Sequence, residues 1–164
     1  GFLKILRDAR YHENEHCLEV QFPFLLHIMP DAEFSPILLS GSHDIAVELA
    51  DTLLPLDGDR TLWVISSDFN HVGPQFRHQP QSYGFESGEA MDRQAIQLIE
   101  AGDIKGFTQF LRKTDATICG ALPILTAMHL IQALKRRNFV FKKYDCSGNQ
   151  TGDINSVGYA ALYS

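Results

Sequence analysis

The sequence predicts a single α/β domain with a mixed or mostly parallel sheet flanked by helices. Two observations lead to this prediction. Segments with apolar residues at helical spacing alternate along the chain with short apolar runs typical of strands. The chain of 164 residues also has the size and composition of one globular domain, with 45% hydrophobic and 21% charged residues. We therefore expect residues 1–164 to form one domain with a sizeable core.

The first two predicted elements are a helix and a strand. Apolar residues at helical spacing predict an amphipathic helix over residues 15–29, which Pro23 would kink or shorten. Residues 34–40, with the sequence FSPILLS, predict a strand that follows this helix. Pro36 places this strand on a sheet edge or marks its start, because proline has no backbone N–H to donate.

The next elements lead into a polar loop. Ser42 can cap a helix over residues 43–54. TLWVIS, at residues 61–66, is a short apolar run of the kind found in strands that are covered on both faces. The stretch 72–88 contains Gly and Pro and has no periodicity, so it predicts a long loop. Long loops in compact domains are often functional.

The second half of the chain predicts three helices and two strands. Ser87 opens the first helix, which Gly102 closes, and Asp103 caps the second. Residues 121–137 show the clearest helical periodicity of the chain. The two closing strands are predicted over residues 139–144 and 156–163.

Charge and cysteine content exclude several functions. A net charge of −6 disfavours nucleic-acid binding, which needs a basic surface. No apolar run approaches the roughly 20 residues of a membrane helix, and the short apolar patch within residues 1–10 lacks a signal-peptide pattern. The cysteines Cys17, Cys119 and Cys146 form no CxxC pair, which disfavours a disulfide framework. We expect a cytoplasmic protein and, without an initiator Met, a fragment or a processed domain.

The stretch SSDFNHVG, residues 66–73, follows an apolar run that predicts a buried strand. Ligands of open α/β sheets bind beyond the carboxyl ends of strands, and Asp68 and His71 would lie at such an end. A nearby carboxylate can fix the tautomer of a histidine, so His71 could act as a general base or as a metal ligand. The alternative is structural, with Asp68 capping the following turn.

Two further stretches carry candidate functional side chains. His16 and Glu19 would share one face of a helix, where such a pair can bind a metal or relay a proton, although a surface hydrogen bond is the commoner role. Cys119 precedes the long helix, whose N-terminal N–H groups favour a thiolate, whereas an inert buried cysteine is the alternative. The residues leave two chemistries open: nucleophilic acyl transfer by a Cys–His–Asp set, or metal binding.

Three segments together resemble the Memo family: EHCLEVQFPF at 15–24, SSDFNHVG at 66–73 and TICG at 117–120. Their order and spacing fit over nearly the whole chain, and the ending SVGYAA at 156–161 is similar too. The chain is similar to the C-terminal portion, somewhat over half, of a complete Memo-like protein. Memo proteins are similar in fold to class III extradiol dioxygenases, which open catechol rings with non-haem iron(II).

The resemblance implies roles for four residues. His71 matches the active-site histidine, Asp68 matches its nearby acid, and His16 matches a histidine that lines the pocket. Cys119 matches the residue that replaces the dioxygenases' carboxylate ligand. The implied cofactor is iron(II), with copper or zinc as alternatives because thiolate is a soft ligand. The family's two other ligand histidines match no segment of this chain, so the resemblance implies an incomplete site.

The function implied by this resemblance is a metal-dependent oxidation, with an unknown small molecule or peptide as partner. Two alternatives come from other classes. One is a non-catalytic module that binds a peptide or a small anion in the same pocket, and the other is a Cys–His hydrolase. We expect neither a nucleic acid nor a membrane as a partner, and the resemblance assigns no role to Glu19.

Overall fold

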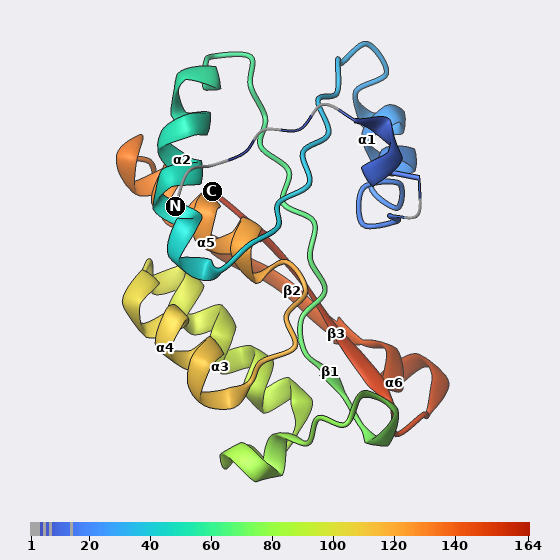
Figure 1. Cartoon of the computed structure of the whole chain (residues 1–164). Helices are drawn as coiled ribbons and strands as arrows, with labels where there is room; N and C mark the ends of the chain where they lie inside the picture. The colour runs from blue at the N-terminus through green and yellow to red at the C-terminus, as the bar shows by residue number, and fades with distance from the viewer. Residues whose placement is uncertain (1–3, 5, 7, 14) are drawn as a thin grey trace.

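The computed structural model describes residues 4, 6, 8–13 and 15–164 (Figure 1). Most of the N-terminal apolar patch lies outside these residues. Six α-helices and three strands form within the described part of the chain. The helices are α1 (Phe22–Ile28), α2 (Ala46–Leu53), α3 (Gly88–Ala101), α4 (Ile104–Thr114), α5 (Ala121–Ala133) and α6 (Ser147–Thr151). The strands are β1 (His71–Val72), β2 (Val140–Cys146) and β3 (Ser156–Tyr163).

The three strands form one sheet in the order β1-β3-β2, so β3 lies in the middle. His71 of β1 lies opposite Val157 of β3, and β2 runs along the other side of β3. Both pairings are antiparallel. The α/β class is confirmed, but the sheet of the described residues is antiparallel rather than mixed or mostly parallel. The chain returns from β2 to β3 through the short α6, whereas a parallel pair needs a longer crossover.

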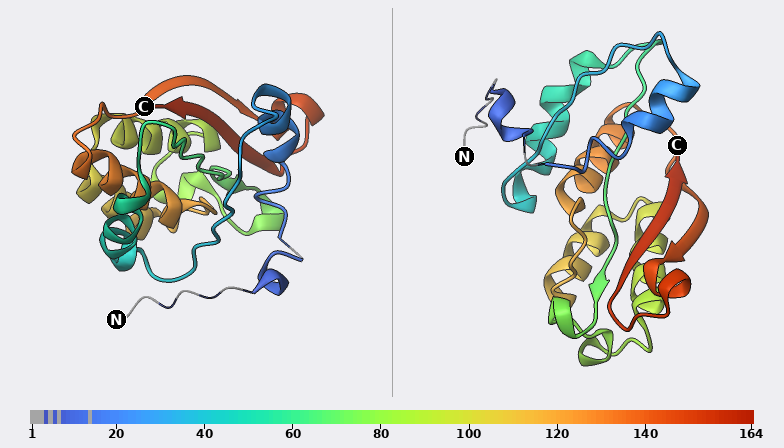
Figure 2. Two further views of the ribbon diagram at one scale, coloured as in Figure 1. Left: turned by 90° about the horizontal axis from the view of Figure 1, so that it is seen from above. Right: turned by 90° about the vertical axis from the view of Figure 1, so that its right-hand side faces the viewer.

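Helices α3, α4 and α5 lie under one face of the β2–β3 pair (Figure 2). Side chains from all three helices form the core, and Met91, Phe107 and Leu125 are almost fully buried there. The helices and closing strands predicted for this half are confirmed, although α5 ends at Ala133 rather than at residue 137. This core also includes side chains that adjoin the candidate site residues in the chain. No helix in the described part of the chain combines the length and apolar character that crossing a membrane requires.

Two of the three predicted helix caps are confirmed. The Ser87 hydroxyl accepts a hydrogen bond from the backbone N–H of Ala90 at 3.1 Å, and the Asp103 carboxylate accepts one from Gly106 at 2.8 Å. Ser42 precedes the short 3-10 turn η2 (His43–Ile45), which leads into α2, and its side chain makes no capping hydrogen bond. Caps were therefore predictable where a full helix begins directly after the capping residue.

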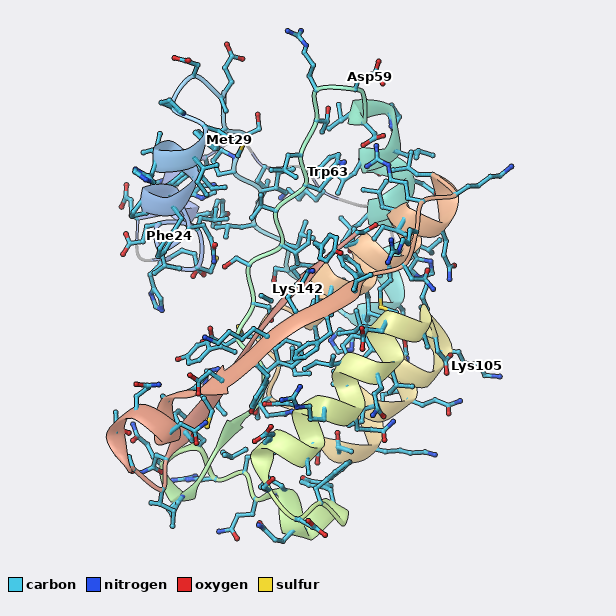
Figure 3. The ribbon with its side chains drawn as sticks, turned by 180° about the vertical axis from the view of Figure 1, so that it is seen from behind. Phe24, Met29, Asp59, Trp63, Lys105 and Lys142 are labelled. Atoms are coloured by element: carbon cyan, nitrogen blue, oxygen red, sulfur yellow. The ribbon has the colours of Figure 1, made fainter. Side chains whose placement is uncertain are left out.

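The helix predicted over residues 15–29 is wrong in extent, because only α1 is helical. Pro23 lies in the first turn of α1, where its missing N–H is not needed, and residues 17–21 form turns. Phe24 and Ile28 of α1 are 69% and 72% exposed, and Figure 3 shows Phe24 well away from α4, which carries Lys105. The apolar spacing therefore did not mark a helix that faces the core.

The strands predicted over residues 34–40 and 61–66 are also wrong. Both segments run extended, without strand pairing among the described residues. Figure 1 shows them passing between α1 and α2, and Figure 3 labels Trp63 on the second one. Leu62 stays 64% exposed. A strand needs a neighbour that shares its backbone hydrogen bonds, so apolar character alone did not make these segments strands.

Candidate functional site

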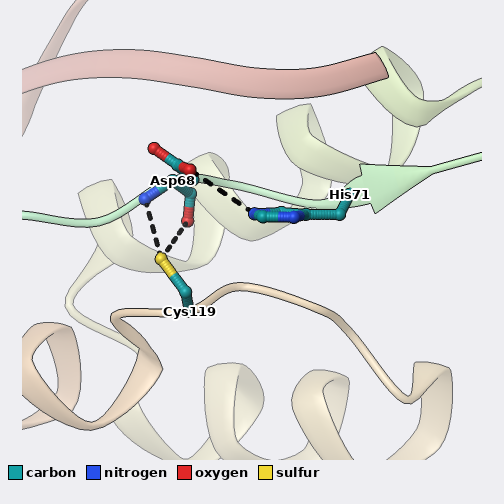
Figure 4. A group of neighbouring side chains, drawn as sticks. All are labelled: Asp68, His71 and Cys119. Carbon is teal, nitrogen blue, oxygen red and sulfur yellow. Dashed lines mark hydrogen bonds and ion pairs between the residues drawn. The ribbon is translucent and has the colours of Figure 1, made fainter. Parts of the chain in front are cut away.

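Three side chains predicted from two separate stretches of the sequence meet in one place (Figure 4). One ligand atom each from Asp68, His71 and Cys119 lies within 4.8 Å of the other two, which makes these residues a possible metal-binding group among the described residues. The Asp68 Oδ2 lies 3.5 Å from the His71 Nε2. The Cys119 Sγ accepts a hydrogen bond from the backbone N–H of Asp68 at 3.1 Å. The cluster therefore combines a carboxylate, an imidazole and a thiol.

The segment that carries Asp68 and His71 is held by the central strand β3. The backbone N–H of Phe69 donates to the carbonyl of Gly158 at 2.8 Å, and the N–H of Gly158 donates to the carbonyl of Asn70 at 3.1 Å. His71 then begins β1 and pairs with β3. The site therefore lies at the start of a paired strand. The sequence-based prediction that it lies beyond the end of strand 61–66 is wrong in this respect.

The segment that carries Cys119 approaches Ser67 unusually closely. Gly120 follows Cys119, and its N–H donates to the Ser67 Oγ at 2.9 Å. A Cβ atom on Gly120 would lie only 2.3 Å from the Ser67 Cβ. Glycine at this position therefore lets the two site segments touch, which brings the exposed Cys119 thiol to Asp68.

The His71 ring is fixed on one side and unsatisfied on the other. It packs edge-to-face with the Phe76 ring, with centroids 5.2 Å apart. Its Nε2 is buried and has no hydrogen-bond partner among the described residues, since the geometry of the 3.5 Å contact with Asp68 falls short of a hydrogen bond. A buried polar atom without a partner is rare in a stable fold. This nitrogen is therefore available to a proton or to a metal ion.

The cluster lies in the wall of a large cavity of about 1080 Å³. His16 lines the same cavity but does not belong to the cluster of three ligand atoms. Glu19 is exposed and does not line the cavity. The expected His16–Glu19 pairing on one helical face is wrong, because residues 17–20 form turns rather than a helix.

Sequence analysis assigned no site role to two residues that line the cavity, Cys17 and Tyr159. Cys17 lines the cavity, and burial together with the Glu15 carboxylate raises the pKa of its thiol to about 11. Tyr159 of β3 lines it too, and burial, with the nearby Asp68 carboxylate as a second cause, raises the pKa of its hydroxyl. Tyr159 could have been suspected from strand alternation, which places every second residue of β3 on one face.

Comparison with known proteins shows the family to which the chain belongs. The family model of the Memo-like protein matches residues 3–163, and the chain therefore belongs to the family of Memo-like proteins. The chain is 30% identical to the "Protein memo-1 homolog" of Caenorhabditis elegans, over 95% of this chain and 49% of that protein. It is 35% identical to a "MEMO1 family protein" of Desulfurococcus amylolyticus, over 94% of this chain and 53% of that protein. The chain thus spans about half the length of the curated relatives it matches.

Proposed function

We propose that this chain forms part of a transition-metal site, in which Cys119 ligates the ion and the Asp68–His71 pair handles protons beside it. Iron(II) is the proposed metal, with copper or zinc as alternatives. The observation that carries the proposal is the convergence of three ligand atoms within 4.8 Å, in a wall of the large cavity. The unsatisfied Nε2 of His71 supports it further.

The residues present fit a metal ion in chemistry and nearly in spacing. A thiolate with an imidazole selects zinc, copper or iron over magnesium and calcium. Ligand atoms about 2.0–2.3 Å from a tetrahedral ion lie about 3.3–3.8 Å apart. The 4.8 Å limit on the separations in this cluster exceeds that spacing by about 1 Å, a difference that side-chain rotation can close.

The proposed reaction is a metal-dependent oxidation of a small molecule or peptide. Bound iron(II) would supply redox chemistry toward dioxygen. His71 would accept or return a proton at Nε2, and Asp68, 3.5 Å away, would orient the ring. His16, in the cavity wall, would polarise the substrate or the oxygen. The chain spans about half the length of its relatives. The complete set of metal ligands and the activity of the whole protein are therefore proposals.

Metal analysis of the anaerobically purified chain tests the proposal. We expect iron or copper in the wild type and its loss in Cys119→Ser, because serine replaces the soft ligand with a weak one. Cys146→Ser is the matched control, since Cys146 lies outside the cavity lining. Equal metal content in wild type and Cys119→Ser would show that the ligand assignment is wrong.

A second candidate is a non-catalytic module that binds a peptide or a small anion in the same cavity. The size of the cavity favours it, as do the two extended segments that line it without strand pairing, 35–41 and 63–68. Such a module would keep its affinity for a partner after the metal has been removed by a chelator. The Cys–His hydrolase ranks last, because the Cys119 Sγ contacts the backbone of Asp68.

A further inference from the structure

Asp92 of α3 lies behind the site and is almost fully buried, with 1% of its surface exposed. Its Oδ1 accepts hydrogen bonds from the backbone N–H of Asn70 at 3.0 Å and from the Asn70 side-chain amide at 2.6 Å. Its Oδ2 accepts one from the Tyr144 hydroxyl at 2.8 Å. A buried carboxylate held by three donors has one orientation, and it fixes the groups that donate to it.

Asn70 extends this constraint to the segment that carries Cys119. The Asn70 Oδ1 accepts a hydrogen bond from the backbone N–H of Thr117 at 2.9 Å. The Thr117 Oγ1 accepts one from the N–H of His71 at 2.7 Å and donates one to the carbonyl of His71 at 3.1 Å. Thr117 and His71 are 46 residues apart in the sequence. Hydrogen bonds therefore set the spacing between the two site segments.

The space around Asp92 is as restricted as its hydrogen bonds. A Cβ atom on Gly158 would lie 2.0 Å from the Asp92 Oδ2. Only glycine therefore fits at this position of β3, next to the carboxylate. Gly158 is the same residue that holds Phe69 and Asn70 through the backbone. Asp92 therefore contacts the central strand β3 and the site segment at one point.

We infer that Asp92 and Asn70 are positioning residues of the site, which hold the segment with Asp68 and His71 in register with the segment that carries Cys119. The inference rests on the metal-binding function proposed above. Neither residue belongs to the cluster of ligand atoms, so each acts through others. A carboxylate that served only to stabilise the core would affect folding and leave the site unchanged in the folded molecules.

Cobalt(II) binding tests the inference, because a thiolate–cobalt charge-transfer band reports on Cys119. We expect Asp92→Leu to weaken cobalt affinity about 10- to 100-fold, as loss of a residue that orients ligands does in other metal sites. Asp92→Asn should stay close to wild type, since its Oδ1 can still accept from Asn70. Asp103→Ala is the control, because it removes the cap of α4 at a distance from the site. An equal loss of affinity in Asp103→Ala would overturn the inference.

Hydrogen exchange of the metal-free chain separates this inference from the proposed function. We expect Asp92→Leu to speed amide exchange in peptides from both site segments, 66–73 and 115–120, while α5 stays protected. If wild type shows no charge-transfer band, the metal function fails, and the exchange data still decide the positioning role. If Asp92→Leu does not fold, Asn70→Ala breaks the same links with a smaller change. Unchanged affinity and unchanged exchange in the folded variants would overturn the inference.

Discussion

At the scale of the residue, burial and hydrogen bonding decide how the charged groups around the site behave. Burial raises the pKa of Asp92, although Asn70 and Tyr144 donate hydrogen bonds to it. The sequence marked Asp68, His71 and Cys119 because motifs and a helix start lie there, but nothing marked Asp92. Its partner Asn70 is 22 residues away, and their contact exists only in the completed fold. Such buried pairs cannot be predicted from local patterns.

Replacing Asp92 with Asn should change how stability depends on pH. The native pKa of Asp92 is raised above the ordinary value of 3.8, so the folded protein holds this proton more tightly than the unfolded chain does. The contribution of Asp92 to stability is greatest below its ordinary pKa of 3.8 and is lost as pH rises through the native pKa. The free energy of unfolding of Asp92→Asn minus that of wild type should therefore increase from about pH 4 to pH 7. Urea denaturation at several pH values measures it, and a constant difference would contradict the assignment.

Cys17 should react slowly with iodoacetamide at pH 8. Because burial and Glu15 raise the pKa of this thiol to about 11, its thiolate fraction is about 100-fold below that of a thiol with the ordinary value of 9.0. Mass spectrometry of the labelled peptide follows the reaction, and the same peptide in the urea-unfolded chain is the control. Equal rates in the folded and unfolded chains would count against this environment for Cys17.

At the scale of the element, the sequence correctly predicted the helix starts that are stabilised by residues close by in the chain. The starts of α3 and α4 were predictable because Ser87 and Asp103 cap them with their own side chains. The segments 34–40 and 61–66 were not predictable in the same way, because a strand depends on a neighbour elsewhere in the chain. The site combines both kinds of segment. One of them leads into the start of α5, and the other leads into the paired strand β1.

Gly120→Ala should destabilise the contact between the two site segments. The added Cβ would lie 2.3 Å from the Ser67 Cβ and 2.8 Å from the carbonyl oxygen of Ser66, so one segment must move. We expect a loss of about 1–3 kcal/mol in the free energy of unfolding, as for other overpacked positions. Gly58→Ala is the matched control, because the heavy atom nearest to its added Cβ, the Thr61 Oγ1, would be 3.8 Å away. Similar stability of the two variants in urea denaturation would refute the close packing.

At the scale of the whole molecule, the cavity is lined both by the packed helical core and by segments outside it. One wall comes from the packed core through α5, and most of the rest comes from the extended segments 35–41 and 63–68 and from the segment 15–24. The comparisons establish the Memo-like family for a chain that spans about half of its relatives. Sequence reasoning placed Asp68, His71 and Cys119 in one pocket through this resemblance, whereas residue patterns alone left acyl transfer and metal binding open.

Metal binding should raise the melting temperature of the whole chain. An ion that binds only the folded state adds about 2.7 kcal/mol of stability at a free concentration 100 times its dissociation constant. For a domain of this size, that corresponds to a rise of about 5–10 °C. The fluorescence of Trp63, which lines the cavity and is the one tryptophan of the chain, can follow the transition. An equal rise in Cys119→Ser would place the stabilising ion elsewhere.

X-ray absorption spectroscopy of the zinc-loaded chain tests most directly whether Cys119 ligates the metal. We predict one sulfur neighbour at about 2.3 Å from the metal in wild type. This neighbour should be lost in Cys119→Ser and kept in Cys17→Ser, which removes the other cysteine of the cavity wall. A sulfur neighbour that persists in Cys119→Ser, or a wild-type spectrum with only nitrogen and oxygen neighbours, would contradict the proposed site.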